Sequence, residues 1–231
     1  MSEFGAALRF ILRDGQVPGA GRLPTLVHLT LSTLAVSGIG IGIAMAVALP
    51  VGVVLGHVHR GSFIAINIGN LWRALPSLAV LAVAVAFLGL GLANVELALI
   101  VLAVPPIVTN AYVAVDGVDR DLVDAARGMG MTGREVLWRV ELPLSLPLIF
   151  AGIRTAAVFV VATTTISALA GYSGTLGDVI NNETSYRLSG VLGGAICVAA
   201  LALAVEAVLA GVQRLLTPRG LRAQRVSNLL S

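Results

Sequence analysis

The chain has 231 residues, of which 57% are hydrophobic and only 12% are charged, and its formal net charge is +3 at pH 7. So little polar surface excludes an ordinary soluble domain of this length. Long apolar runs with few charges are instead typical of membrane spans, because roughly 20 such residues cross the hydrocarbon layer as a helix. The sequence therefore predicts an all-α integral membrane protein.

The first 24 residues precede the long apolar runs and include an early acidic residue, Glu3. They lack the apolar core and the small-residue cleavage pattern of a signal peptide. Several apolar side chains of this segment can share one face of a short helix: Phe4, Leu8, Ile11 and Leu12. We expect residues 1–24 to form either an interfacial helix on the bilayer or a flexible lead-in.

Five apolar runs follow, and each predicts a membrane-spanning helix: 26–55, 74–92, 97–115, 147–170 and 190–212. Residues 25–215 would form the transmembrane domain, with a charged loop at 116–146, and residues 216–231 would form a tail. Placing this loop in the cytoplasm puts eleven arginines near the inner face and four outside, in agreement with the positive-inside rule. The N-terminus is then outside and the C-terminus is cytoplasmic.

The third run contains polar residues directly after the pair Pro105–Pro106. Facing lipid would be costly for an asparagine, so Asn110 is expected to face either another helix or an aqueous path. Thr109 and Tyr112 lie beside it in the sequence. If the path alternative holds, Thr109, Asn110 and Tyr112 are the candidate translocation-path residues.

The loop at 116–146 concentrates charge in a chain that otherwise avoids it. The sequence has 15 basic and 12 acidic residues, and ten of these lie between Asp116 and Glu141. Asp119 or Asp121 can cap a first short helix, and Arg127 near its end suits the helix dipole.

The residues that follow predict a sharp corner and a second short helix. Gly128 and Gly130 are the residue type that ends helices, and Thr132 with Glu135 fits a capping box. Prolines at 143 and 147 are expected to interrupt the regular helix before the fourth span. The pattern favours a rigid protruding hairpin, which is suited to docking.

Catalytic and metal chemistry find little support. All fifteen basic residues are arginine, so an ordinary P-loop, which needs a lysine, is excluded. The three histidines His28, His57 and His59 lack ligand partners at spacings typical of a metal site. The stretch 171–174 is similar to the serine motif of rhomboid proteases, but no histidine follows Ser173, which favours a glycine-rich turn.

The hairpin also carries a resemblance. "DAARGMG" at 124–130, followed by "VELP" at 140–143, resembles the EAA loop of permease subunits of ABC importers, with Asp124 in place of glutamate and Val140 in place of isoleucine. The resemblance implies a type I ABC importer permease fold, in which the first short helix couples to a separate ATP-binding subunit. The coupling residues that it implies are Asp121, Asp124, Ala125, Ala126, Arg127, Gly128, Gly130, Thr132 and Glu135.

Further stretches resemble one branch of these permeases, those for osmoprotectants such as glycine betaine, carnitine and choline. They include "RALPSLAVLA" at 73–82, "VELPLSLPLIFAGIRTA" at 140–156 and "AGYSGTLGDVI" at 170–180. The branch implies a non-catalytic subunit in the bacterial cell membrane, forming the path for such a solute. It binds no cofactor itself, because ATP and Mg are bound by a partner ATPase dimer.

The other implied partners are an extracytoplasmic substrate-binding protein, a second permease copy or paralogue, and the lipid bilayer, but no nucleic acid. Two rival functions stay open. One is a permease for another small solute such as methionine. The other is a secondary carrier, which usually shows two similar halves, whereas this sequence shows no internal repeat.

Overall fold

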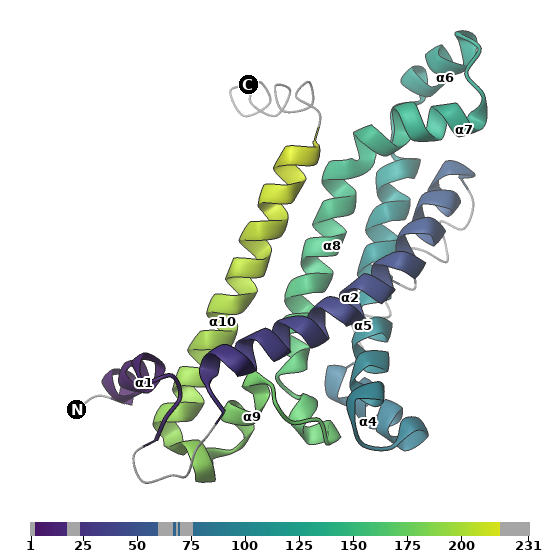
Figure 1. The fold of residues 1–231 in the computed structure, drawn as a ribbon. Helices are drawn as coiled ribbons and strands as arrows, with labels where there is room; N and C mark the ends of the chain where they lie inside the picture. Colours follow the sequence, from purple (N-terminus) through teal and green to yellow (C-terminus); the bar gives the residue numbers. More distant parts are fainter. Residues whose placement is uncertain (1–2, 18–23, 60–66, 68, 70–75, 218–231) are drawn as a thin grey trace. The chain divides into compact units, whose positions relative to one another are not determined.

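The computed structural model describes residues 3–17, 24–59, 67, 69 and 76–217, and every regular element in them is helical (Figure 1). Two short elements differ from α-helices, since η1 is a π-helical turn and η2 is a 3₁₀ helix. The elements in chain order are α1 Glu3–Leu12, α2 Leu26–His57, α4 Ser77–Leu88, α5 Leu92–Asp116, α6 Arg120–Gly128, α7 Gly133–Val136, η1 Leu137–Glu141, α8 Leu142–Thr164, η2 Ser167–Ala170, α9 Leu176–Asn181 and α10 Glu183–Leu216.

Among the described residues, four helical stretches are long and apolar enough to cross a membrane: Leu26–His57, Leu92–Asp116, Gly133–Thr164 and Glu183–Leu216. The span expected at 74–92 is represented by the shorter apolar helix α4, whose 12 residues rise only about 18 Å. It begins after Pro76 and ends at Gly89, which has a φ of 74°. Residues 74 and 75, like the tail beyond 217, lie outside the described residues. The predicted all-α membrane fold is confirmed.

The fourth span differs from its expected bounds. The prolines at 143 and 147 do not interrupt the helix: α7, η1 and α8 form one continuous helical stretch from Gly133 to Thr164. Leu142 N–H donates to Leu137 O, five residues back, so the helix widens into a π turn just before Pro143. A proline donates no N–H and crowds the preceding turn, and this wider turn accommodates it. The stretch also ends earlier than expected, at Thr164 instead of residue 170.

The chain divides into two compact units, each with its own apolar core. The first comprises Met1–Ile43, Leu75–Ala103 and Ala157–Glu206, and the second comprises Ala44–Ala74, Val104–Ala156 and Ala207–Ser231.

In the first unit, α1 belongs to the core. Phe10 is 4% exposed and packs edge-on against Tyr186, with ring centroids 6.2 Å apart. A Cβ added to Gly193 of α10 would lie 2.6 Å from Phe10, so the absence of a side chain there makes room for the ring. Of the apolar face expected from the sequence, Phe4, Leu8 and Leu12 are exposed. The interfacial position of this helix stays a prediction.

In the second unit, α5 packs closely against α2. A Cβ added to Gly52 would lie 2.7 Å from both Ala111 Cβ and Val108 O, and one added to Gly56 would lie 2.8 Å from Tyr112 O. Gly52 and Gly56 form a GxxxG motif, which lets two membrane helices approach at backbone distance.

On another side of α5 lies α8. A Cβ added to Gly152 would lie 2.5 Å from Asn110 Cβ. The Ser145 hydroxyl donates to Ala114 O at 2.7 Å. Apolar residues of α2, α5, α8 and α10 complete the core of this unit: Met45, Leu49, Val53, Ala111, Ala114, Ile149, Phe150, Ile153 and Leu209.

Candidate coupling site

The charged loop at 116–146, here named the coupling loop, contains the predicted helical hairpin formed by α6 and α7. The first helix begins as the sequence indicates. Asp119 is its N-cap, and a carboxylate oxygen of Asp119 accepts from the Asp121 N–H at 3.0 Å. Of the two capping candidates, the structure thus selects Asp119, while Asp121 and Arg127 lie in the first and last turns, where their charges suit the helix dipole.

The corner of the hairpin depends on one of the two predicted glycines. Gly130 has a φ of 88°, in the region that favours glycine, and its N–H donates to Arg127 O. Gly128 is instead the last residue of α6. At either position, beyond the chain neighbours and the backbone of the same helix, an added Cβ would meet no atom of the described residues within 4 Å. The turn therefore requires glycine at 130 for its backbone conformation, and not for lack of space.

The second helix begins with the predicted capping box. Thr132 Oγ1 accepts from the Glu135 N–H, while the Glu135 carboxylate accepts from the Thr132 N–H at 2.9 Å. These reciprocal hydrogen bonds satisfy backbone donors that the first turn of a helix leaves without partners. The capping box thus fixes the residue at which α7 begins.

The hairpin has a small core of its own. Val123 and Ala126 of α6 pack on the fully buried Val136 of α7, with Val118, Met131 and Val140 partly buried around them. In Figure 1 the two helices lie together at the beginning of the long stretch that continues into α8. The hairpin is thus a packed structure joined to a span without an intervening loop.

The opposite face of α6 is exposed and carries four of the nine predicted coupling residues. Asp121, Asp124, Ala125 and Gly128 recur at helical spacing and are all exposed, whereas Ala126 points into the hairpin core. The sequence did not single out the large apolar side chains that are exposed on the loop: Leu122, Met129 and Trp138. Exposed apolar side chains among charges are typical of a protein-docking surface.

The capping box yields a direct prediction. Thr132→Ala removes the side-chain acceptor, which costs about 1 kcal/mol of local stability and raises the opening of the hairpin about fivefold. Hydrogen exchange of the backbone amides at 132–136 measures this change. Thr155→Ala is the matched control, because its hydroxyl bonds only to Ala151 O within α8. Equal exchange in the two variants would contradict a stabilising role for the capping box.

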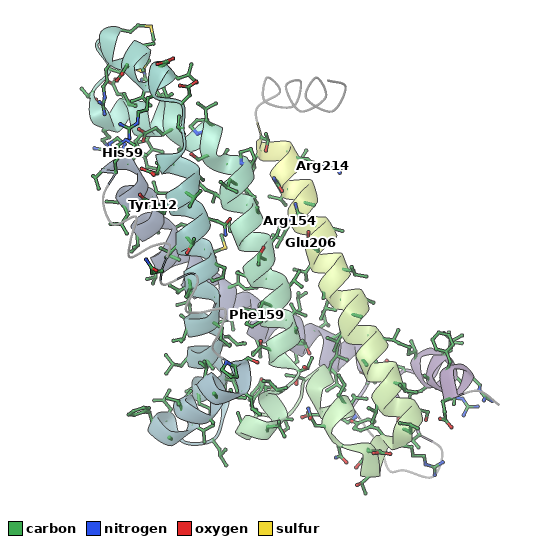
Figure 2. All side chains as sticks on the ribbon, turned by 180° about the vertical axis from the view of Figure 1, so that it is seen from behind. His59, Tyr112, Arg154, Phe159, Glu206 and Arg214 are labelled. Carbon is green, nitrogen blue, oxygen red and sulfur yellow. The ribbon has the colours of Figure 1, made fainter. Side chains whose placement is uncertain are left out.

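Near each end of the coupling loop, an acidic residue pairs with a histidine at the end of α2. His57 Nδ1 lies 2.5 Å from Glu141 Oε2, and His59 Nδ1 lies 2.7 Å from Asp116 Oδ1. Figure 2 shows His59 beside the base of the hairpin. Sequence analysis missed these pairs because their members are 84 and 57 residues apart. The clustering of His57 and His59 at one helix end was the only signal.

An arginine within the α8 span is also bonded in the second unit. Arg154 Nη1 donates to Gln213 Oε1 at 2.8 Å, and Gln213 Nε2 donates to Pro147 O at 3.0 Å. Figure 2 shows Arg154 on α8 and Arg214 on the neighbouring α10. An intramembrane arginine with a partly buried partner on another helix holds the two helices together.

The candidate path residues lie in a closely packed part of α5. Asn110 Nδ2 donates to Pro106 O at 2.7 Å, and its Cβ faces Gly152 of α8. Tyr112 is 2% exposed. Thr109 is partly buried, close to Gly69. These contacts support the helix-packing alternative for Asn110, and the path assignment stays a prediction.

Known proteins similar to this chain are transporter subunits. A family model described as the binding-protein-dependent transport system inner membrane component matches residues 38–221. The carnitine transport permease protein OpuCB of Listeria monocytogenes is 40% identical over 202 residues, which cover 87% of this chain and 90% of that protein. The glycine betaine/carnitine/choline transport system permease protein OpuCB of Bacillus subtilis is 36% identical over 201 residues, covering 87% and 92%.

A solved structure has a similar fold. A chain of the MetNI methionine ABC transporter in an inward-facing conformation superposes with a TM-score of 0.72, at 23% identity, over 84% of this chain and 96% of that one. This likeness concerns the fold alone. Since the family model and the relatives each cover most of the chain, this protein belongs to the inner-membrane components of binding-protein-dependent transport systems, the permease subunits of ABC importers.

Proposed function

We propose that this permease forms the translocation path for a small quaternary-ammonium osmoprotectant, such as glycine betaine, choline or carnitine. The observation that carries the proposal is the identity of 36–40% over nearly the whole chain to permeases named for these solutes. The chain itself carries out no covalent chemistry in this proposal. ATP and Mg are bound by a separate pair of ATPase subunits.

In the proposed mechanism, the exposed face of α6 docks on the ATPase. The rigid hairpin core around Val136 and its unbroken connection to α8 support this role, because a soft loop would absorb the motion that it should transmit. The docking residues are those implied by the resemblance, with Asp124, Ala125 and Gly128 at the centre of the exposed face. Closure of the ATPase pair would then move the spans between inward-facing and outward-facing arrangements.

The orientation follows from the same proposal. The coupling loop must face the compartment that holds ATP, so the C-terminus is cytoplasmic and the N-terminus is outside. A substrate-binding protein delivers the solute on the outer side, and a second permease, either a copy or a paralogue, completes the path. The subunit composition of the purified transporter would show whether the second permease is a copy of this chain or a paralogue.

Uptake of labelled solute tests the proposed substrate class. We expect cells with the complete transporter to accumulate at least one of glycine betaine, choline and carnitine after a salt upshift, and cells lacking this chain to lose that uptake. The control is expression of the chain from a plasmid in the deletion strain, which should restore uptake. Absence of uptake of all three solutes in the intact strain would show that the substrate belongs to another class.

A further inference from the structure

The end of α2 carries two histidines, and each is paired with an acidic residue near one end of the coupling loop. His57 pairs with Glu141, where the loop enters α8, and His59 pairs with Asp116, where α5 ends. The loop is joined directly to α5 and α8, whereas α2 is separated from it in the chain by α4 and α5. Motion of the hairpin can therefore reach the end of α2 directly only through noncovalent contacts.

The His57–Glu141 pair is largely buried. The Glu141 side chain is 1% exposed, and its second oxygen, Oε1, has no hydrogen-bond partner among the described residues. His57 thus supplies a polar contact to a carboxylate that is almost inaccessible to water. A buried carboxylate without a partner is strongly disfavoured, so this contact constrains where the end of α2 can lie.

The position of Glu141 depends on the π turn. Glu141 is the last residue of η1, in which five residues occupy a turn wider than that of an α-helix. Such turns change the direction in which the following side chains point and are frequent at functional sites. The same turn that accommodates Pro143 therefore determines which side of the helix presents the carboxylate to His57.

The His59–Asp116 pair lies at two helix ends. His59 has a φ of 51°, in the left-handed region, and its N–H donates to Gly56 O. Asp116 is the last residue of α5, where the helix dipole disfavours a negative charge. An imidazole N–H donated to Asp116 offsets that unfavourable position. This pair is more exposed, with about one third of each side chain accessible, and is expected to contribute less than the buried pair.

We propose that His57 and His59 are positioning residues that attach α2 to the coupling loop, so that movement of the hairpin is passed to α2 as well as to α5 and α8. The close packing at Gly52 and Gly56 keeps α2 beside α5. The two histidine–carboxylate contacts hold the end of α2 to both ends of the coupling loop. This inference rests on the proposed coupling role of the loop.

The test measures solute uptake and ATP hydrolysis on the same proteoliposomes, containing this chain, its ATPase and its binding protein. With His57→Ala we expect ATP hydrolysis to continue while uptake per ATP hydrolysed falls on the order of tenfold, within the range of coupling between distant sites. His59→Ala should give a smaller loss. His28→Ala, an exposed histidine at the opposite end of α2, is the control and should leave the ratio unchanged.

A conservative variant separates positioning from simple structural support. In His57→Asn the side-chain amide places an N–H near the position of Nδ1, so it can still donate to Glu141. We expect His57→Asn to restore most of the uptake per ATP that His57→Ala loses. If His57→Ala does not assemble, His59→Ala still decides, because it removes the contact with Asp116 and retains the contact between His57 and Glu141.

The outcomes are distinct. An unchanged ratio in both alanine variants would overturn the inference, as would a parallel fall of uptake and hydrolysis caused only by less assembled transporter. If the native transporter shows no ATP-driven uptake of any osmoprotectant, the proposed function itself fails. If the native transporter works and Gly130→Asp blocks it, but the histidine variants behave normally, only the attachment of α2 is wrong.

Discussion

Gly130→Asp is expected to reduce ATP-driven uptake to background while leaving the amount of this protein in the membrane unchanged. Apart from its two chain neighbours, no atom of the described residues lies within 4 Å of a Cβ added at Gly130, so the fold can accommodate a side chain. The backbone strain, with φ at 88°, costs about 1–2 kcal/mol for a non-glycine residue. The larger effect comes from outside the chain, because the new carboxylate would project from the corner of the hairpin that is proposed to dock on the ATPase.

A glycine elsewhere in the chain provides a matched control. Gly174 also has a positive φ, 98°, and open space around its Cβ, but it lies outside the coupling loop. Gly174→Asp introduces the same charge with similar strain and should retain uptake. Uptake and protein level are measured in membranes from the same cells. Normal transport by Gly130→Asp would show that the hairpin corner does not dock, and equal loss in both variants would attribute the effect to strain.

Gly52→Val is expected to lower the thermal stability of the purified permease in detergent. The added side chain would be forced against Ala111 and the carbonyl of Val108, and overpacking of this kind costs about 1–3 kcal/mol. Backbone atoms cannot move aside as a flexible side chain can, so α2 and α5 must separate. The midpoint of thermal unfolding, followed by the loss of monodisperse protein on size-exclusion chromatography, measures the effect.

The same helix contains the control for this substitution. Gly42 lies in α2, and outside the backbone of this helix no atom in the described part of the chain lies within 4 Å of an added Cβ, so Gly42→Val changes the same residue type without the clash. The midpoint of Gly42→Val should stay close to that of the unmodified protein. If Gly52→Val unfolds at the same temperature as Gly42→Val, the GxxxG contact is not a determinant of stability.

Local signals in the sequence were sufficient for the existence of the long apolar helices and for the hairpin, but not for the bounds of the fourth span. The capping box of Thr132 and Glu135 and the N-cap at Asp119 are encoded within four residues, and both appear in the structure. The prolines were misleading because a π turn compensates for the missing N–H of Pro143, and nothing in the local pattern announces that turn.

Contacts between helices were beyond reach of the sequence. The close approach of Gly52 to Ala111 and the pairing of His57 with Glu141 depend on how each helix is rotated about its axis. An almost uniformly apolar helix such as α2 has no distinct polar face from which to infer that rotation. The same limit applies to the candidate path residues. In this structure the Asn110 amide donates to Pro106 O on its own helix, which the sequence alone does not reveal.

The π turn at Leu137–Glu141 also determines where this segment can change in length. A π turn holds one residue more than the α-helical turn that it replaces, so losing one residue here would return the stretch to ordinary helix and leave the direction of the hairpin relative to α8 nearly unchanged. In ordinary helix each residue advances the chain by about 100° around the axis, so one residue added or lost there, with the π turn kept, would turn the exposed face of α6 in another direction. The wider turn is thus the place on this stretch where the chain can lose a residue while the hairpin keeps its direction.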